Sequence, residues 1–193
     1  MITTKTRTEY LNAVRNLLGN KNPTCIEIGV AEGIFSNQIL DRLTPEKLYL
    51  LDPWQSGHDK NSKTKTYSGP ISGSLTAYSN EDQKNKIEAN LKEKIKTNQV
   101  VINQGYSYDF VDSYKDDYFD FVYIDGCHLY ECVKADLEMF LPKLKSDGLM
   151  CGHDYFKYSN FGVIEAVNEF CENFNFEMVI LNNPSFDWAL KRK

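Results

Sequence analysis

The stretch that decides the fold of this chain is Cys25-Ile26-Glu27-Ile28-Gly29-Val30-Ala31-Glu32-Gly33. Its apolar residues predict a short strand, and two glycines four positions apart predict a tight turn that leads into a helix. In open α/β sheets such a turn lies at the carboxyl end of a strand, where free backbone N–H groups face a nucleotide-like ligand. We therefore expect a cofactor-binding site that includes Glu27, Gly29, Ala31 and Gly33.

Strand-like and helix-like segments alternate on both sides of this turn. The expected strands are 26–30, 47–51, 99–103, 119–124, 149–152, 177–181 and 186–191. The expected helices include one within 1–20 and others at 35–43, 81–96, 129–144 and 161–174. This order predicts one doubly wound α/β domain over 1–193, with helices on both faces of a mostly parallel, seven-stranded sheet that ends in an antiparallel hairpin.

Composition excludes several classes of function. The net charge is -5 and no segment concentrates basic residues, so we expect no nucleic-acid partner. No run of about 18 apolar residues occurs, which predicts no membrane span. The five cysteines are odd in number and lack CxxC spacing, which predicts reduced core residues. Because the first residues also lack the apolar core of a secretion signal, we expect a cytoplasmic protein.

Acidic residues close four of the expected strands and should meet at one edge of the sheet. They are Glu27, Asp52, Asp125 and Asp154. Asp52 follows Gly33 by 19 positions, where its carboxylate could accept both hydroxyls of a ribose. A dinucleotide fingerprint would need glycines where Ala31 and Ile34 stand, so the match to NAD is poor.

Further motifs, together with this pattern, resemble the motifs of a known family. The turn and Asp52 combine with Gly105-Tyr-Ser107 and with Asp120-Phe-Val-Tyr-Ile-Asp125-Gly-Cys-His128-Leu-Tyr130-Glu. This combination resembles the class I S-adenosylmethionine-dependent methyltransferases, which have a Rossmann-like fold. Together with Gly152-His-Asp154-Tyr155, it is similar to the macrocin-type sugar O-methyltransferases over residues 24 to 172. The resemblance implies O-methylation of a hydroxyl on a small molecule or sugar.

The resemblance also implies roles for individual residues. S-adenosylmethionine would place its methionine part on the turn from Gly29 to Gly33, its ribose on Asp52, and its adenine edge on Tyr106 and Ser107. Carboxylates such as Glu27 and Asp125 favour a nearby positive charge, which suits a sulfonium.

His128 follows Asp125 by three positions and is our candidate for the general base, with Asp125 beside it at the catalytic centre. The alternative is that His128 caps a helix or orients Asp125. The resemblance further implies Mg²⁺ or another divalent metal at Asp125, His153 and Asp154. Cys127 and His153 stand where the family often has carboxylates, which favours a softer metal or none.

The segment 53–80 is far longer than a usual strand-to-helix loop and is expected to be a lid or a substrate-loop insertion. Its aromatic residues Trp54, Tyr67 and Tyr78 either line an acceptor pocket or pack on the body of the domain. The leading segment 1–19 could pack on its own domain or on a second copy, which leaves a homo-oligomer open. Two alternatives to the methyltransferase stay open here, namely a non-catalytic cofactor-binding module of the same fold and an NAD-dependent oxidoreductase.

Overall fold

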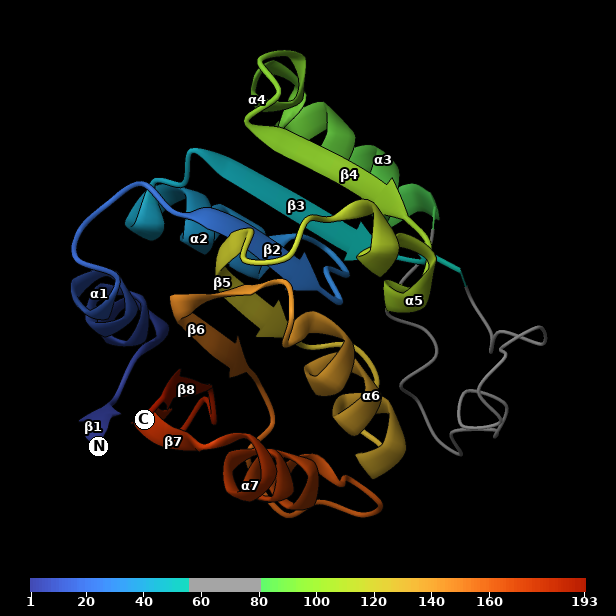
Figure 1. Cartoon of the computed structure of the whole chain (residues 1–193). Coiled ribbons are helices and arrows are strands. Elements are labelled where there is room, and N and C mark those ends of the chain that lie inside the picture. The colour runs from blue at the N-terminus through green and yellow to red at the C-terminus, as the bar shows by residue number, and fades with distance from the viewer. Residues whose placement is uncertain (56–80) are drawn as a thin grey trace.

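The computed structural model describes residues 1–55 and 81–193, and one sheet of eight strands runs through them (Figure 1). The strand order across the sheet is β1-β7-β8-β6-β5-β2-β3-β4. Their bounds are β1 Ile2–Thr4, β2 Thr24–Ile28, β3 Lys47–Asp52, β4 Val100–Gln104, β5 Phe119–Ile124, β6 Leu144–Gly152, β7 Phe176–Asn182 and β8 Trp188–Arg192. Strand β8 is antiparallel to β6 and β7, and every other pair is parallel, which confirms the expected hairpin.

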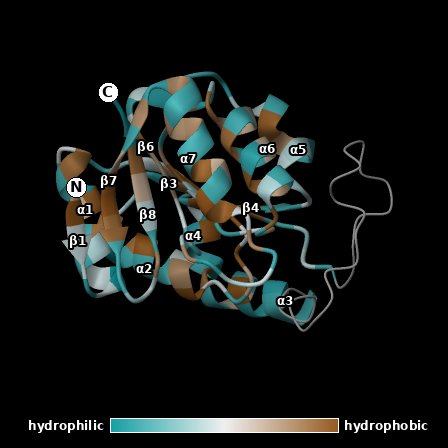
Figure 2. Cartoon of the chain, turned by 90° about the horizontal axis from the view of Figure 1, so that it is seen from below, coloured by the Kyte–Doolittle hydropathy of each residue, from teal (hydrophilic) through white to brown (hydrophobic). Residues whose placement is uncertain are grey.

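Helices cover both faces of this sheet. Their bounds are α1 Arg7–Leu17, α2 Ile34–Leu43, α3 Glu81–Asn90, α4 Lys92–Lys96, α5 Ser107–Phe110, α6 Tyr130–Phe140 and α7 Val163–Phe174, with a 3₁₀ turn at Val111–Ser113. One core cluster joins α1, α2 and α3 to the sheet through residues such as Leu11, Ile39 and Ile87. A second cluster joins α6 and α7 to the other face. In Figure 2, hydrophobic residues concentrate in the strands and on the helix sides that face them.

Strand β5 is the centre of the sheet, and all six of its residues are buried. Phe121 and Tyr123 belong to the core on the α1 side, whereas Val122 and Ile124 belong to the core on the α6 side. Successive residues of a strand face opposite sides of the sheet, so a strand buried on both faces needs apolar residues at every position. This explains the nearly continuous apolar run in the sequence.

The structure corrects the element boundaries in three places. The sheet has eight strands instead of seven, because Ile2–Thr4 pairs with β7, and a three-residue strand is too short to show a periodicity. The expected helix 129–144 ends at Phe140, and β6 begins at Leu144. Within β6 the pairing with β5 is irregular and jumps from Leu144 to Leu149. The expected helix 81–96 is interrupted at Leu91.

The carboxyl ends of the central strands are held in line by hydrogen bonds that continue beyond the strands. The N–H of Gly29 donates to Leu51, and the N–H of Asp125 donates to Ile28. The N–H of His153 donates to Ile124 in the same way. The first residues after β2, β5 and β6 therefore share one edge of the sheet, which we call the rim.

None of the helices in residues 1–55 and 81–193 combines the length and the apolar character that a membrane crossing requires. Most of the expected insertion at 53–80, including Tyr67 and Tyr78, lies outside the described residues, so its interpretation as a lid stays a prediction. Trp54 is described, and it packs in the core with 2% of its surface exposed.

Candidate active site

The glycine turn lies against the loop that follows β5. Gly29 has a φ of +89°, and a Cβ at this position would lie 2.1 Å from the carbonyl oxygen of Asp125. Gly33 has a φ of +72° and precedes the first residue of α2. Both positions require the left-handed backbone that glycine adopts without steric cost. The turn can therefore approach the loop at Asp125 only because Gly29 has no side chain.

Asp52 braces this turn from the end of β3. Its Oδ2 accepts hydrogen bonds from the N–H groups of Val30 at 2.9 Å and Ala31 at 3.0 Å. Its Oδ1 accepts one from the N–H of Trp54 at 2.7 Å, and the indole of Trp54 donates to the carbonyl of Ala31. The expectation of free N–H groups is wrong for Val30 and Ala31, because Asp52 already binds them. The binding of a ribose by Asp52 stays a prediction.

Glu27 lies inside β2 instead of ending it, and its side chain turns toward α2. Its carboxylate accepts a hydrogen bond from the Ser36 hydroxyl at 2.5 Å, and only 2% of the residue is exposed. Burial raises the pKa of Glu27 to about 8, although the hydrogen bond from Ser36 opposes this rise. The position expected for Glu27 at a strand end is therefore wrong, and its place beside the cofactor stays a prediction.

Four ionisable residues that were expected in the site do meet at the rim after β5 and β6. Nε2 of His128 lies 2.9 Å from Oδ2 of Asp154 and 3.6 Å from Oδ1 of Asp125. Nδ1 of His153 lies 3.0 Å from Oδ1 of Asp154 and 3.7 Å from Oδ1 of Asp125. Each of the two carboxylates is thus shared by both imidazoles.

Neighbouring residues hold His128 in this position. Its ring packs against Phe161 with centroids 4.6 Å apart, and its carbonyl accepts a hydrogen bond from the N–H of Gly162. A Cβ on Gly162 would lie 2.4 Å from Tyr130, so the chain before α7 can approach α6 only at a glycine. Asp154 has a φ of +61°, a conformation that Asp adopts more readily than most residues.

The charges of this cluster shift one another's protonation. Burial lowers the pKa of His128, but Asp125 and Asp154 outweigh burial and raise it to about 9. Burial raises the pKa of Asp154, but the two imidazoles outweigh it and bring it below its ordinary value. Loss of hydration raises the pKa of Asp125 despite 24% exposure of its side chain. With these partners alone, His128 carries a proton at neutral pH, so its role as a base stays a prediction.

The cluster has the composition of a divalent-cation site. One ligand atom from each of Asp125, His128 and Asp154 lies within 4.8 Å of the others. Nε2 of His128 is buried and makes no aligned hydrogen bond, although two carboxylates face it. A buried polar atom of this kind needs a partner, and a cation between the carboxylates would supply one. The predicted set contained His153 instead of His128, and the structure places His153 beside Asp154 but outside this group of three.

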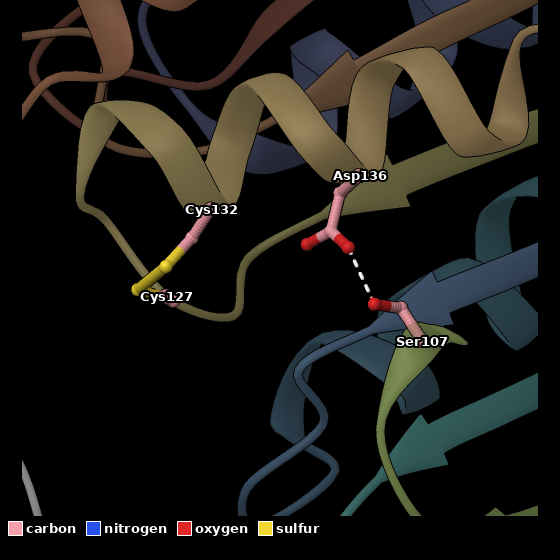
Figure 3. Close-up of a disulfide and its surroundings, with 4 residues drawn as sticks. All are labelled: Ser107, Cys127, Cys132 and Asp136. Carbon is pink, nitrogen blue, oxygen red and sulfur yellow. Dashed lines mark hydrogen bonds between the residues drawn. A yellow bond between two sulfur atoms is a disulfide. The ribbon is translucent and has the colours of Figure 1, made fainter. Parts of the chain in front are cut away.

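Tyr106 and Ser107, the residues expected at the adenine edge, open α5 on the α6 side of the rim. The rings of Tyr106 and Tyr108 stack with centroids 5.4 Å apart. Ser107 is buried, and its hydroxyl donates a 2.5 Å hydrogen bond to Asp136 of α6 (Figure 3). Burial raises the pKa of Asp136 to about 7, against the opposing effect of Ser107. No role in the site was predicted for Asp136, because its partner Ser107 is 29 positions away in the sequence.

A disulfide closes the loop that carries Asp125 and His128. It joins Cys127 in this loop to Cys132 in the first turns of α6 (Figure 3). The Cα atoms of the two cysteines are 5.8 Å apart, within the range that a disulfide spans. The expectation that all five cysteines are reduced is therefore wrong for this pair. Cys25, Cys151 and Cys171 are free thiols, as expected.

Arg7, the first residue of α1, also reaches the rim and was not identified from the sequence. Its Nε lies 3.2 Å from Oδ1 of Asp187, and its guanidinium carbon lies 4.8 Å from the centre of the Phe35 ring. A basic residue at the start of an amphipathic helix carries no local signal of such a position. Only the tertiary contact with Asp187, close to the other end of the chain, reveals it.

Comparison with solved structures relates this architecture to known enzymes. An O-methyltransferase from Bacillus cereus, solved in complex with SAH (S-adenosylhomocysteine), is 15% identical, with a TM-score of 0.60 over 95% of this chain and 78% of that chain. A protein from Staphylococcus aureus assigned as a caffeoyl-CoA O-methyltransferase is 17% identical, with a TM-score of 0.64 over 98% and 84%. A protein from Clostridium thermocellum assigned as an rRNA methylase is 11% identical, with a TM-score of 0.65 over 99% and 97%.

Sequence identities this low show a common fold and give no information on the substrate of this chain. No curated protein matches the chain in sequence. Residues 26–155 match the model of a family described as a methyltransferase domain. The matched range spans more than half of the chain and contains the glycine turn, Asp52 and the whole rim cluster. The chain therefore belongs to this methyltransferase-domain family.

Proposed function

We propose that the chain is an S-adenosylmethionine-dependent methyltransferase that methylates a hydroxyl group of a small molecule or sugar with the help of a divalent cation. The observation that carries this proposal is the convergence of Asp125, His128 and Asp154 within 4.8 Å, on the rim next to the glycine turn. Methyl transfer is an in-line displacement, so a site that fixes donor and acceptor side by side supplies much of the catalysis.

The charges and positions of the described residues suit the proposed cofactor. When bound, S-adenosylmethionine supplies an activated methyl group on a positively charged sulfur. The carboxylate of Asp125 lies next to the turn and favours this charge. Asp52 holds the turn in shape, and Tyr106 and Ser107 lie farther along the same edge. The family match favours this cofactor over NAD, for which the glycine spacing is also wrong.

The rim cluster also fits a divalent cation, which Asp125, His128 and Asp154 would hold. Mg²⁺ prefers oxygen ligands, so the imidazole favours Mn²⁺ or another transition metal. A bound cation would act as a Lewis acid and lower the pKa of the acceptor hydroxyl. In this arrangement His128 is a ligand, and the general-base role predicted for it applies to a reaction without metal.

The acceptor class rests on charge and on resemblance. The net charge of -5 disfavours nucleic acid, although one structural neighbour is assigned as an rRNA methylase. Two neighbours are O-methyltransferases by name, which supports transfer to oxygen. The motif from Asp120 to Glu131 supports a sugar acceptor of the macrocin type.

A transfer assay tests this proposal. The chain is incubated with methyl-labelled S-adenosylmethionine and a panel of sugars, catechols and other hydroxylated acceptors, with Mg²⁺, with Mn²⁺ or with EDTA. We expect labelled product and S-adenosylhomocysteine with at least one acceptor, and their loss with EDTA. Asp154→Asn should remove the dependence on metal together with most of the rate. Asp116→Asn is the matched control, because Asp116 is an exposed residue that pairs only with Lys143 among the described residues.

Each outcome has a separate meaning. Binding of S-adenosylhomocysteine without transfer to any acceptor would support the non-catalytic module instead. Methyl transfer that is unaffected by EDTA but lost in His128→Ala would assign His128 as the general base and would exclude a role for the cation. Calorimetric titration of MnCl₂ alone, with wild type and Asp154→Asn, tests the metal site independently of activity.

A further inference from the structure

Arg7 is held at the rim from two sides. Its Nε contacts Asp187 at 3.2 Å, and its guanidinium lies over the ring of Phe35, the second residue of α2. The Phe35 ring in turn packs against Tyr123 of β5, with centroids 4.1 Å apart. An aromatic ring under a guanidinium fixes its plane, since the flat cation stacks on the ring face.

The partner of Arg7, Asp187, is itself held by several contacts. Asp187 is fully buried and accepts a hydrogen bond from the Tyr123 hydroxyl at 2.6 Å and another from the Asn182 side chain at 2.7 Å. Its carboxylate is therefore satisfied by three partners on separate elements. Because Asp187 directly precedes β8 and Arg7 opens α1, this contact ties the leading helix to the sheet.

Most of the hydrogen-bonding capacity of Arg7 is not used by the part of the chain that the structure describes. A guanidinium has five N–H donors in a planar fork. Within residues 1–55 and 81–193, neither terminal nitrogen of Arg7 donates a hydrogen bond to another residue, and a quarter of the side chain is exposed. The fork is the part of arginine that matches a carboxylate with two parallel hydrogen bonds.

The surroundings of Arg7 indicate which ligand the fork would meet. Phe35 comes two residues after Gly33, so the guanidinium lies beside the start of α2, where the glycine turn ends. The charge of Arg7 also acts on Glu27 and on Asp125, which flank the same turn. Under the proposed function, this corner receives the amino-acid part of the cofactor.

We propose that Arg7 is a cofactor-positioning residue whose terminal nitrogens bind the carboxylate of the amino-acid part of S-adenosylmethionine. This inference rests on the proposed function and adds to it a residue outside the matched family range. It also gives the leading helix a role, because α1 brings Arg7 to the rim. Arg7 would thereby align the sulfur with the acceptor without touching the reacting atoms.

A binding experiment with paired ligands tests this role without any turnover. S-adenosylhomocysteine and its decarboxylated analogue differ only in the carboxylate. Their dissociation constants are measured by calorimetry for wild type and Arg7→Met. We expect the variant to bind S-adenosylhomocysteine on the order of 10- to 100-fold more weakly, as for a lost hydrogen bond to a charged group, and to bind the analogue as wild type does.

Arg15→Met is the matched control, since Arg15 lies in the same helix but bonds to Arg42 and Thr44 at the other end. It should leave both affinities unchanged. Arg7→Lys keeps the charge and loses the fork, so it should weaken S-adenosylhomocysteine less than Arg7→Met does. It also serves as the test variant if Arg7→Met does not fold, which thermal unfolding reports.

The outcomes separate the two proposals. Equal weakening of both ligands in Arg7→Met would overturn the inference, because Arg7 would then act only by holding α1 on the sheet. Unchanged affinity for both ligands would also overturn it, and a higher KM for carboxylated acceptors alone would move Arg7 to the acceptor site. If wild type does not bind S-adenosylhomocysteine, the proposed function fails and this inference fails with it.

Discussion

The two ends of strand β5 carry aspartates in opposite situations. Asp120 near the amino end lies 2.8 Å from Lys145 and 2.9 Å from Lys21, and it accepts a hydrogen bond from the N–H of Thr24. Among the described residues, Asp125 beyond the carboxyl end forms its ion pairs with the imidazoles of His128 and His153, at 3.6 and 3.7 Å. Burial would raise the pKa of both, but the two lysines lower that of Asp120, whereas that of Asp125 is raised.

Under the proposed function, this difference separates a carboxylate that stabilises the fold from one that acts in the site. The negative charge of Asp120 is neutralised by the ammonium groups of Lys21 and Lys145. Under the proposed function, Asp125 and Asp154 would bind a further cation or a cationic ligand in place of the proton that they hold on His128. The two aspartates lie at the two ends of the same strand, so the residues that face each end make the difference.

The largest effect on stability should come from disrupting the contact between Gly29 and the backbone of Asp125, which positions the carboxyl end of β5. Gly29→Ala places a Cβ 2.1 Å from the backbone oxygen of Asp125, at a φ that alanine rarely adopts. We expect a loss of about 4 kcal/mol or more in the free energy of unfolding, measured with urea. Gly126→Ala is the control, because nothing lies within 4 Å of its added Cβ. Near-native stability of Gly29→Ala would contradict the tight approach.

Removing the charge of Asp125 should affect function and not stability. Asp125→Asn should lower methyl transfer and Mn²⁺ affinity on the order of 100-fold or more. The melting temperature should stay or rise, since a carboxylate with a raised pKa is less stable when ionised. Rates and thermal unfolding are measured on the same preparations. A lower melting temperature with full activity would reverse the assignment.

The same change at the other end of the strand should have the converse effect. Asp120→Asn leaves two lysines without their buried partner and should cost about 1–3 kcal/mol, or roughly 2–10 °C in melting temperature. The lysine side chains are 35% and 40% exposed, which limits the loss. Activity per folded molecule should be retained. Asp147→Asn, a change at an exposed partner of Lys21, should have a much smaller effect on stability.

Taken per pH unit, the smallest effect is a pH dependence that distinguishes buried carboxylates by sign. The pKa of Asp136 is about 7 in the folded state and about 4 in the unfolded chain, so its contribution to stability decreases as pH rises from about 4 to 7. Asp136→Asn should remove up to roughly 1.4 kcal/mol per pH unit of this slope. Glu27, with a pKa of about 8, should retain a slope of the same sign.

Urea unfolding at several pH values measures these slopes. Asp120 contributes in the opposite direction, because its lowered pKa stabilises the fold above the unfolded pKa, and this stabilisation is lost as pH falls. A pH profile for Asp136→Asn that is identical to that of wild type would show that Asp136 is not buried as the structure has it.

Much of the fold could be predicted from the sequence because the relevant signals are local. The apolar run of β5, the glycine turn after β2 and the amphipathic helices each follow from neighbouring residues. Asp125 and Asp154 were identified as candidates because they follow predicted strands. His128 was identified by its position three residues after Asp125, and His153 through the family resemblance. It missed β1, whose three residues are too few to form a pattern.

The sequence by itself determined the order of seven of the strands and of the main helices, and it placed Asp52, Asp125 and Asp154 at the carboxyl edge, because periodicity and turn chemistry act over a few positions. Only the tertiary structure decided which of them touch. It paired Arg7 with Asp187 and Ser107 with Asp136, placed His128 instead of His153 in the group of three, and joined Cys127 to Cys132. Such contacts depend on how distant elements pack against each other, which no local pattern encodes.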